Sequence, residues 1–167
     1  MVRLPHNQPL QAASILDRLL DSEPERATDP AVLEAETSNG LRESLRRDLS
    51  ILLNTRCRPT SHPADLVPLV DSLVAFGVED FFNASLVTDM QRKNFAARLQ
   101  DRIARFEPRL EDLSVSLPSQ SDDDRRSLRL RISARYRARP GLPPMVFDTR
   151  LDPVTHHFKV VSGRGRG

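Results

Sequence analysis

Three carboxylates, Glu79, Asp80 and Glu107, are the residues of this sequence best suited to acid–base chemistry. Hydrolysis of a glycosidic bond needs two such groups at a defined separation, one of them with a raised pKa. No spacing in the sequence links any two of these carboxylates to one site. With one tyrosine and no tryptophan, the chain also offers few aromatic rings for a sugar-binding cleft. The sequence therefore predicts no catalytic residues.

The histidines and the cysteine are also poorly spaced for binding a metal ion. His156 and His157 are adjacent in an expected strand, so their side chains should point to opposite faces of a sheet. Cys57 and His62 lack the second pair of ligands that a closed zinc site needs. The glycines at 163–167 precede no helix and make no phosphate-binding loop. We expect neither a metal nor a cofactor.

Charge and composition limit the partners and the compartment. The 167 residues include 25 basic and 23 acidic ones, and a net charge of +2 argues against bulk binding of nucleic acid. Cys57 is the single cysteine, which fits a reducing compartment. Residues 1–30 lack the apolar run of a signal peptide, and no stretch approaches the roughly 18 apolar residues that span a bilayer. We expect a cytoplasmic protein.

Amphipathic helices are expected in the first two thirds of the chain. Apolar residues recur at intervals of three and four in residues 10–21, 41–54 and 88–106. Thr88 or Ser85 can cap the last of these helices, and Pro108 stops it. A shorter helix is expected near residues 68–75, with Gly77 directly after its end.

The last third of the chain predicts a sheet, because the apolar period falls from about 3.6 to about 2 residues. Strands are expected at residues 113–117, 128–136, 145–151 and 156–161, with a tight turn at 152–155. Helices followed by a meander of about four antiparallel strands predict an α+β fold, with the N-terminal helices packed on one face of the sheet. The expected organisation is an N-terminal helix and linker (1–38), one domain (39–161) and a flexible tail (162–167).

Two features allow more than one interpretation. Arg129, Arg131, Arg135 and Arg137 alternate with apolar residues and would form a basic strand face, either solvated or bound to an acidic partner. Nucleic acid is less well supported there, because that face has no aromatic residues for base stacking. Residues 106–110 (Phe-Glu-Pro-Arg-Leu) form either a simple helix stop or a rigid docking knob.

Four segments together resemble the TssE family of type VI secretion baseplate subunits, which is related to the lysozyme-like baseplate wedge proteins of contractile phages. They are residues 14–24, residues 41–56 ending in Leu-Leu-Asn-Thr-Arg, residues 72–81, and residues 103–110 containing Phe-Glu-Pro-Arg-Leu. They follow one another in the family's order over nearly the whole chain. Cys57 and Phe76 depart from the family, which often has a basic residue and a tyrosine there.

The resemblance implies a structural, non-enzymatic wedge subunit that links the baseplate to the contractile sheath and helps to initiate sheath assembly. Residues 39–161 would form the TssE-like domain. The implied partners are TssF, TssG, TssK and the sheath proteins TssB and TssC, at a secretion apparatus docked on the inner membrane. The family's assembly motif corresponds here to Glu107, Pro108 and Arg109.

The resemblance also implies a sheet edge that pairs with strands of the sheath by β-augmentation. We expect residues 145–151 or 156–161 to supply that edge. Two alternatives stay open: a regulatory protein-binding module with the fold of a stress-response anti-adaptor, and a lysozyme-like glycosidase.

Overall fold

The computed structural model describes residues 24–25, 38–58, 69, 72–79, 88–118, 128–138, 141–152 and 154–163. The chain divides into two compact units, residues 1–45 and 46–167. The second unit holds the sheet and is described below. The expected helix at 10–21, as well as His62 and Asp80, lies outside the described residues. None of the described helices is long and apolar enough to cross a membrane.

Two long helices confirm the amphipathic helices predicted at residues 41–54 and 88–106. Helix α2 spans Ser38–Asn54 and α4 spans Asp89–Phe106. Thr88 caps α4 through a capping box: its hydroxyl accepts from the Gln91 N–H, and the Gln91 side chain accepts from the Thr88 N–H. This exchange satisfies backbone donors that the first turn of a helix leaves unpaired.

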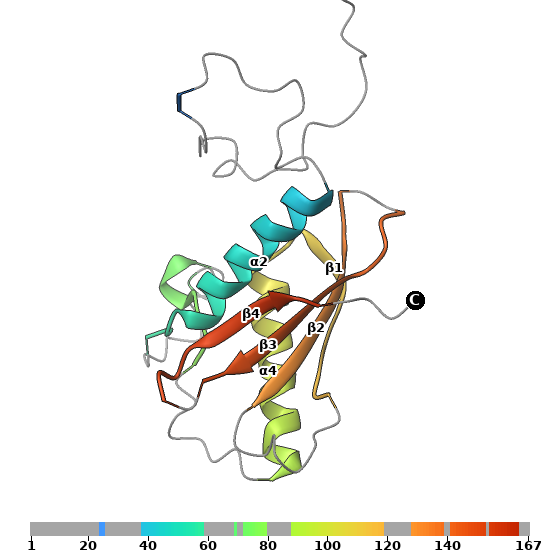
Figure 1. Ribbon diagram of the computed structural model, residues 1–167. Helices are drawn as coiled ribbons and strands as arrows, with labels where there is room; N and C mark the ends of the chain where they lie inside the picture. The colour runs from blue at the N-terminus through green and yellow to red at the C-terminus, as the bar shows by residue number, and fades with distance from the viewer. Residues whose placement is uncertain are drawn as a thin grey trace, which may run out of the picture. The chain divides into compact units, whose positions relative to one another are not determined.

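Four strands form one antiparallel sheet in the order β1-β2-β3-β4 (Figure 1). They are β1 (Leu110–Ser116), β2 (Arg129–Tyr136), β3 (Met145–Leu151) and β4 (Phe158–Ser162). The predicted α+β fold is therefore confirmed. The last strand begins later than expected, because His156 has a φ of 59° and cannot continue a strand.

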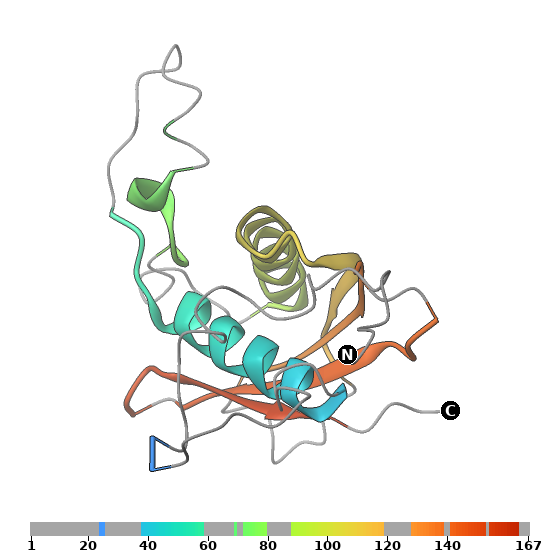
Figure 2. The ribbon, with the colours of Figure 1, turned by 90° about the horizontal axis from the view of Figure 1, so that it is seen from above.

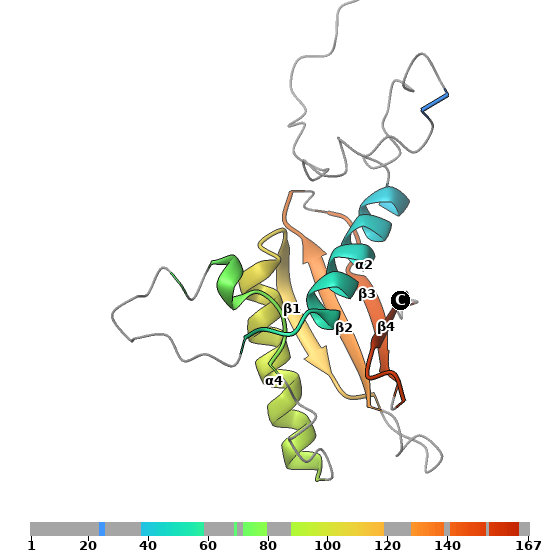
Figure 3. The ribbon, with the colours of Figure 1, turned by 90° about the vertical axis from the view of Figure 1, so that its left-hand side faces the viewer.

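The core lies between the helices and one face of the sheet. Every second residue of β2 is buried, as the alternating pattern predicts: Leu130, Ile132, Ala134 and Tyr136. From α4, Phe95 stacks on Phe158 of β4 with ring centroids 6.5 Å apart. Figures 2 and 3 show α4 and the second half of α2 on the same side of the sheet. The opposite face of the sheet carries charged residues of the strands, such as Arg131, Arg150 and Lys159.

The short helix expected near residues 68–75 is described only in part, as a 3-10 helix, η2 (Leu73–Ala75). Gly77 follows it with a φ of +104°, which glycine adopts without the strain that a Cβ atom brings. It also lies in a tight place, because Val78 forms a parallel bridge with Arg56. A Cβ atom on Gly77 would lie 2.5 Å from the carbonyl oxygen of Thr55.

Replacing Gly77 by alanine should therefore destabilise the fold through both strain and collision. Gly141 is a matched control, because its φ is +100° but nothing lies within 4 Å of an added Cβ atom. We expect Gly141→Ala to lower the free energy of unfolding by about 1 kcal/mol and Gly77→Ala by roughly 3 kcal/mol. Urea denaturation of both variants measures the difference, and equal losses would show that the close approach to Thr55 is unimportant.

Candidate assembly site

The junction between α4 and β1 is built by backbone contacts that leave little freedom. The Glu107 N–H donates to the Ile103 carbonyl at 2.8 Å and ends the helix. The Leu110 N–H then donates to the Glu107 carbonyl at 3.1 Å and closes a tight turn around Pro108. The carbonyl of Arg109 accepts from the Arg137 N–H at 2.8 Å, just beyond the end of β2. The turn is thus anchored to the helix and to the sheet.

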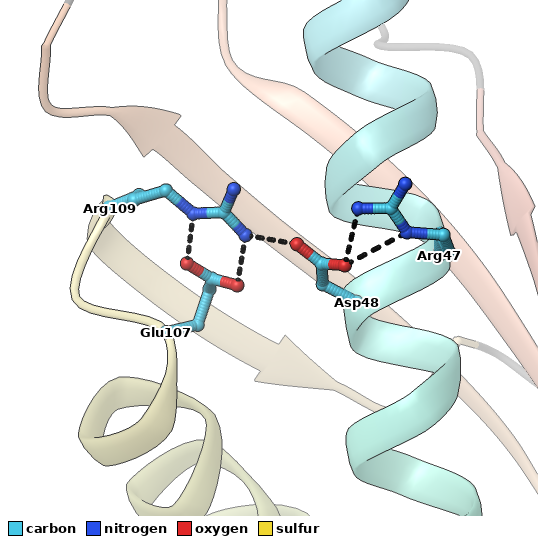
Figure 4. A network of polar contacts seen from close by, with 4 residues as sticks. All are labelled: Arg47, Asp48, Glu107 and Arg109. Atoms are coloured by element: carbon cyan, nitrogen blue, oxygen red, sulfur yellow. Dashed lines mark hydrogen bonds and ion pairs between the residues drawn. The ribbon is translucent and has the colours of Figure 1, made fainter. Parts of the chain in front are cut away.

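The turn brings the side chains of Glu107 and Arg109 together in a bidentate ion pair (Figure 4). The Arg109 Nε donates to Oε1 of Glu107 at 2.5 Å, and Nη2 donates to Oε2 at 2.6 Å. The same Nη2 donates to Oδ2 of Asp48 on α2 at 2.6 Å. The second oxygen of Asp48 accepts from Arg47 at 3.0 and 3.1 Å. We call Arg47, Asp48, Glu107 and Arg109 the junction network.

Burial makes this network important for stability. The Glu107 side chain is only 7% exposed, and those of Arg109 and Asp48 are 23% and 22% exposed. Burial by itself would lower the pKa of the Arg109 guanidinium, but the hydrogen bonds and charges of Glu107 and Asp48 outweigh it and raise that pKa. Arg109 therefore stays charged at any working pH, and its planar fork satisfies the buried carboxylate of Glu107.

An apolar groove borders the junction network. It has a volume of about 350 Å³ and is lined by Asp48, Leu49, Ile51, Leu52, Phe76, Phe106, Glu107, Pro108 and Arg109. Phe76 and Phe106 meet edge to face, with ring centroids 5.3 Å apart. Ile51 is 47% exposed, although it is a large aliphatic residue. The groove thus combines apolar walls with one rim of fixed charge, which is typical of a protein-binding surface.

Comparison with known protein families identifies the chain. Residues 39–141 match the family described as baseplate wedge protein gp25. The chain belongs to this wedge family. No curated protein and no solved structure matches it. The match confirms the resemblance found in the sequence, and it includes α2, α4, β1, β2 and the junction between α4 and β1.

Baseplate wedge proteins are structural components of a multi-subunit complex. In this member of the family, the two described carboxylates that could have done acid–base chemistry have separate partners. Glu79 accepts from Arg98 at 3.4 Å and from Arg102 at 3.1 Å, whereas Glu107 is bound by Arg109. Arg102 also donates to the carbonyl of Ala75 at 3.1 Å. Glu79 thus helps to hold the segment after η2 against α4.

Two described histidines and the cysteine of this wedge protein lie in loops. His156 and His157 precede β4 and are exposed, so the expectation that they lie in a strand is wrong. The Asp152 carboxylate forms this turn by accepting from the Val154 and Thr155 N–H groups, which lowers the pKa of Asp152. Cys57 is half-buried. Within the described ranges, no three metal-ligating residues lie together.

The basic strand face is partly neutralised in the structure. Arg131 donates to Asp148 on β3 at 2.8 Å, which raises the pKa of Arg131, and Arg135 pairs with Asp112. Strand β2 ends at Tyr136, so Arg137 lies in the following turn and not on the strand face, which corrects the expectation. The face is therefore a mixture of charges.

The strand order excludes one of the two segments that were expected to supply the free edge of the sheet. Strand β3 (Met145–Leu151) pairs with β2 on one side and β4 on the other, so it offers no edge. The edges of the sheet are β1 and β4. The pairing of β1 is irregular between Glu111 and Ser114, where Asp112 has a φ of 49°. Strand β4 has a continuous register with β3.

Removing the guanidinium of Arg109 should destabilise the fold strongly, because it leaves the Glu107 carboxylate buried without a partner. We expect Arg109→Ala to lower the free energy of unfolding by about 3 kcal/mol. Arg109→Lys keeps the charge but loses the bidentate geometry and should fall between this variant and the wild type.

Arg131→Ala is the control for loss of an arginine, because the Arg131–Asp148 pair is solvent-exposed and should matter little. Chemical denaturation of the three variants measures their free energies of unfolding and shows whether the junction network stabilises the fold. Equal effects of Arg109→Ala and Arg131→Ala would mean that the junction network does not stabilise the fold.

Proposed function

We propose that this protein is a baseplate subunit of a type VI secretion system, which links the baseplate to the contractile sheath and helps to initiate sheath assembly. The main support is that a chain of the wedge family carries a Glu-Pro-Arg junction, with its glutamate buried and bound by the arginine, beside an exposed apolar groove. Its partners in this proposal are TssF, TssG and TssK in the baseplate and TssB and TssC in the sheath. The complex would lie on the cytoplasmic side of the inner membrane, and the subunit would act without catalysis.

We assign different roles to the three residues of the assembly motif. Glu107 is buried and accepts two hydrogen bonds from Arg109, so it positions that side chain. Pro108 is exposed and lines the groove, and Arg109 supplies the charged rim. A partner from the baseplate would place apolar side chains against Ile51 and Phe106. Because Arg109 also stabilises the fold, its removal alone cannot separate binding from folding.

The sheath would bind at the edge strand β4. Strand β1 is less suitable, because its irregular register would interrupt an added strand. In addition, the Gln100 side chain of α4 already accepts from the outward N–H of Val115 in β1, at 3.0 Å. Strand β4 pairs regularly with β3 and can template a further strand through its backbone groups.

A charge placed in the groove should block assembly without unfolding the protein. Ile51→Glu puts a carboxylate on an exposed site that lines the groove, beside Asp48 and Glu107. We expect a tagged Ile51→Glu protein to lose at least about tenfold of the TssF and TssG recovered by wild type, because a desolvated charge costs more than about 1.4 kcal/mol. Co-purification from cells that express these partners measures the loss.

Met90→Glu is the matched control, since Met90 is an exposed apolar residue of α4, 68% exposed, and does not line the groove. It should bind as wild type does. Equal retention by the two variants would remove the groove from the assembly site. Failure of the wild type to retain any baseplate protein would defeat the whole proposal and favour the regulatory protein-binding module.

Proline in β4 should weaken sheath binding. Ser162 is exposed at the end of β4, and its N–H points away from β3, because the next residue, Gly163, donates to Val146 of β3. Ser162→Pro removes this outward donor and leaves the bonds to β3 in place. We expect it to reduce co-purification of TssB and TssC severalfold, whereas Ser162→Ala, which keeps the N–H, should have no effect. Unchanged recovery with both would exclude β4 as the sheath-binding edge.

A further inference from the structure

The outer edge of β4, which faces away from β3, is partly covered by side chains of α2. Asn54 makes two hydrogen bonds to one strand residue: its Oδ1 accepts from the Phe158 N–H at 2.7 Å, and its Nδ2 donates to the Phe158 carbonyl at 3.0 Å. This is the pair of bonds that a neighbouring strand would make to Phe158. Arg46 donates to the carbonyl of Val160, at a longer distance of 3.4 Å.

The alternation of inward and outward hydrogen bonds along β4 shows which of its backbone groups remain open to a partner strand. Because the Gly163 N–H donates inward to Val146, the residues two and four positions before it also bond to β3. Phe158, Val160 and Ser162 therefore direct their N–H and carbonyl groups outward. Among the described residues, the outward N–H of Val160 and both backbone groups of Ser162 have no hydrogen-bond partner.

We propose that an added strand pairs with β4 only along Val160–Ser162, and that the Asn54 side chain ends the pairing at Phe158 and so fixes its register. This inference rests on the proposed role of β4 as a binding edge, and it identifies which residues are open to a partner. A shift of one residue would place each side chain of the added strand on the wrong face of the sheet, so a fixed end has a clear use.

The side chains beside this segment define the chemistry of the partner. On the open face, Lys159 stands directly opposite Arg150, and both are exposed. Like charges opposite each other destabilise a strand pair, and a carboxylate on the next strand would relieve this repulsion. Val161 on the same face is 44% exposed. The partner is therefore an extended segment with an apolar residue beside Val161 and, just past the end of the pairing, an acidic residue near Lys159.

Amide hydrogen exchange of the full-length protein, followed residue by residue by NMR, tests the edge assignment without a partner. We expect the Phe158 amide to exchange about tenfold more slowly than the Ser162 amide, because only the first is hydrogen-bonded. Asn54→Ala should remove this difference. Asn54→Asp should keep it, because a carboxylate still accepts from the Phe158 N–H. The Val161 amide, which bonds to β3, reports any global loss of stability.

Addition of purified TssB–TssC tests the pairing itself. Exchange of the Val160 and Ser162 amides should slow while that of Phe158 stays unchanged, and in Asn54→Ala the slowing should extend to Phe158. Lys159→Glu should weaken the protection by the sheath proteins, although it replaces the repulsion with Arg150 by an attraction and leaves the free protein at least as stable.

A different experimental result would contradict each part of the proposal. Rapid exchange of Phe158 in the free wild type, or slow exchange of Ser162, would overturn the edge assignment. Protection that reaches Phe158 in the wild type when TssB–TssC is added would overturn the role of Asn54. If TssB–TssC changes no amide at all, the sheath link of the proposed function fails, whereas the rates in the free protein still decide which part of the edge is open.

Discussion

The Glu107 carboxylate lies at the end of α4, where only 7% of its side chain is exposed, and a carboxylate buried in this way needs a positively charged partner. Arg109 can reach it because Pro108 closes a turn between the two residues. Asp48 then binds the same guanidinium from α2. One buried charge thus joins α2, α4 and the start of the sheet.

The two faces and the two edges of the sheet are used differently. Helices cover one face (Figure 3). The other face carries the ion pairs Arg131–Asp148 and Arg135–Asp112. At the edges, amide side chains from the helices take the place of a neighbouring strand: Gln100 binds β1 and Asn54 binds β4. Partial cover of this kind reduces indiscriminate pairing while leaving a short open segment for a specific partner.

Stability and the proposed assembly contact share residues at the junction. Arg109 satisfies a buried carboxylate and also forms the rim of the groove, so a change there affects the fold before it affects any contact. The exposed neighbour Ile51 lies outside the junction network and gives cleaner access to binding. For the same reason, a loss of assembly in a variant of the Glu-Pro-Arg motif is informative only when its stability is measured as well.

The sequence alone determined the α+β fold, three of the four strands to within two residues, the end of α4 just before Pro108 and the family. These features depend on local periodicity, capping and proline chemistry, which neighbouring residues decide. The first strand starts at Leu110, before its alternation becomes visible, because the turn at Pro108 leads directly into pairing with β2.

Only the tertiary structure decided which distant residues meet. Asp48 and Arg109 are 61 positions apart, and Asn54 and Phe158 are 104 positions apart. Strand order likewise placed Met145–Leu151 inside the sheet, where the sequence had left it as a candidate edge. Periodicity assigns a residue to a face of its own element, but pairing between elements depends on how the whole chain packs, and a single sequence does not specify that locally.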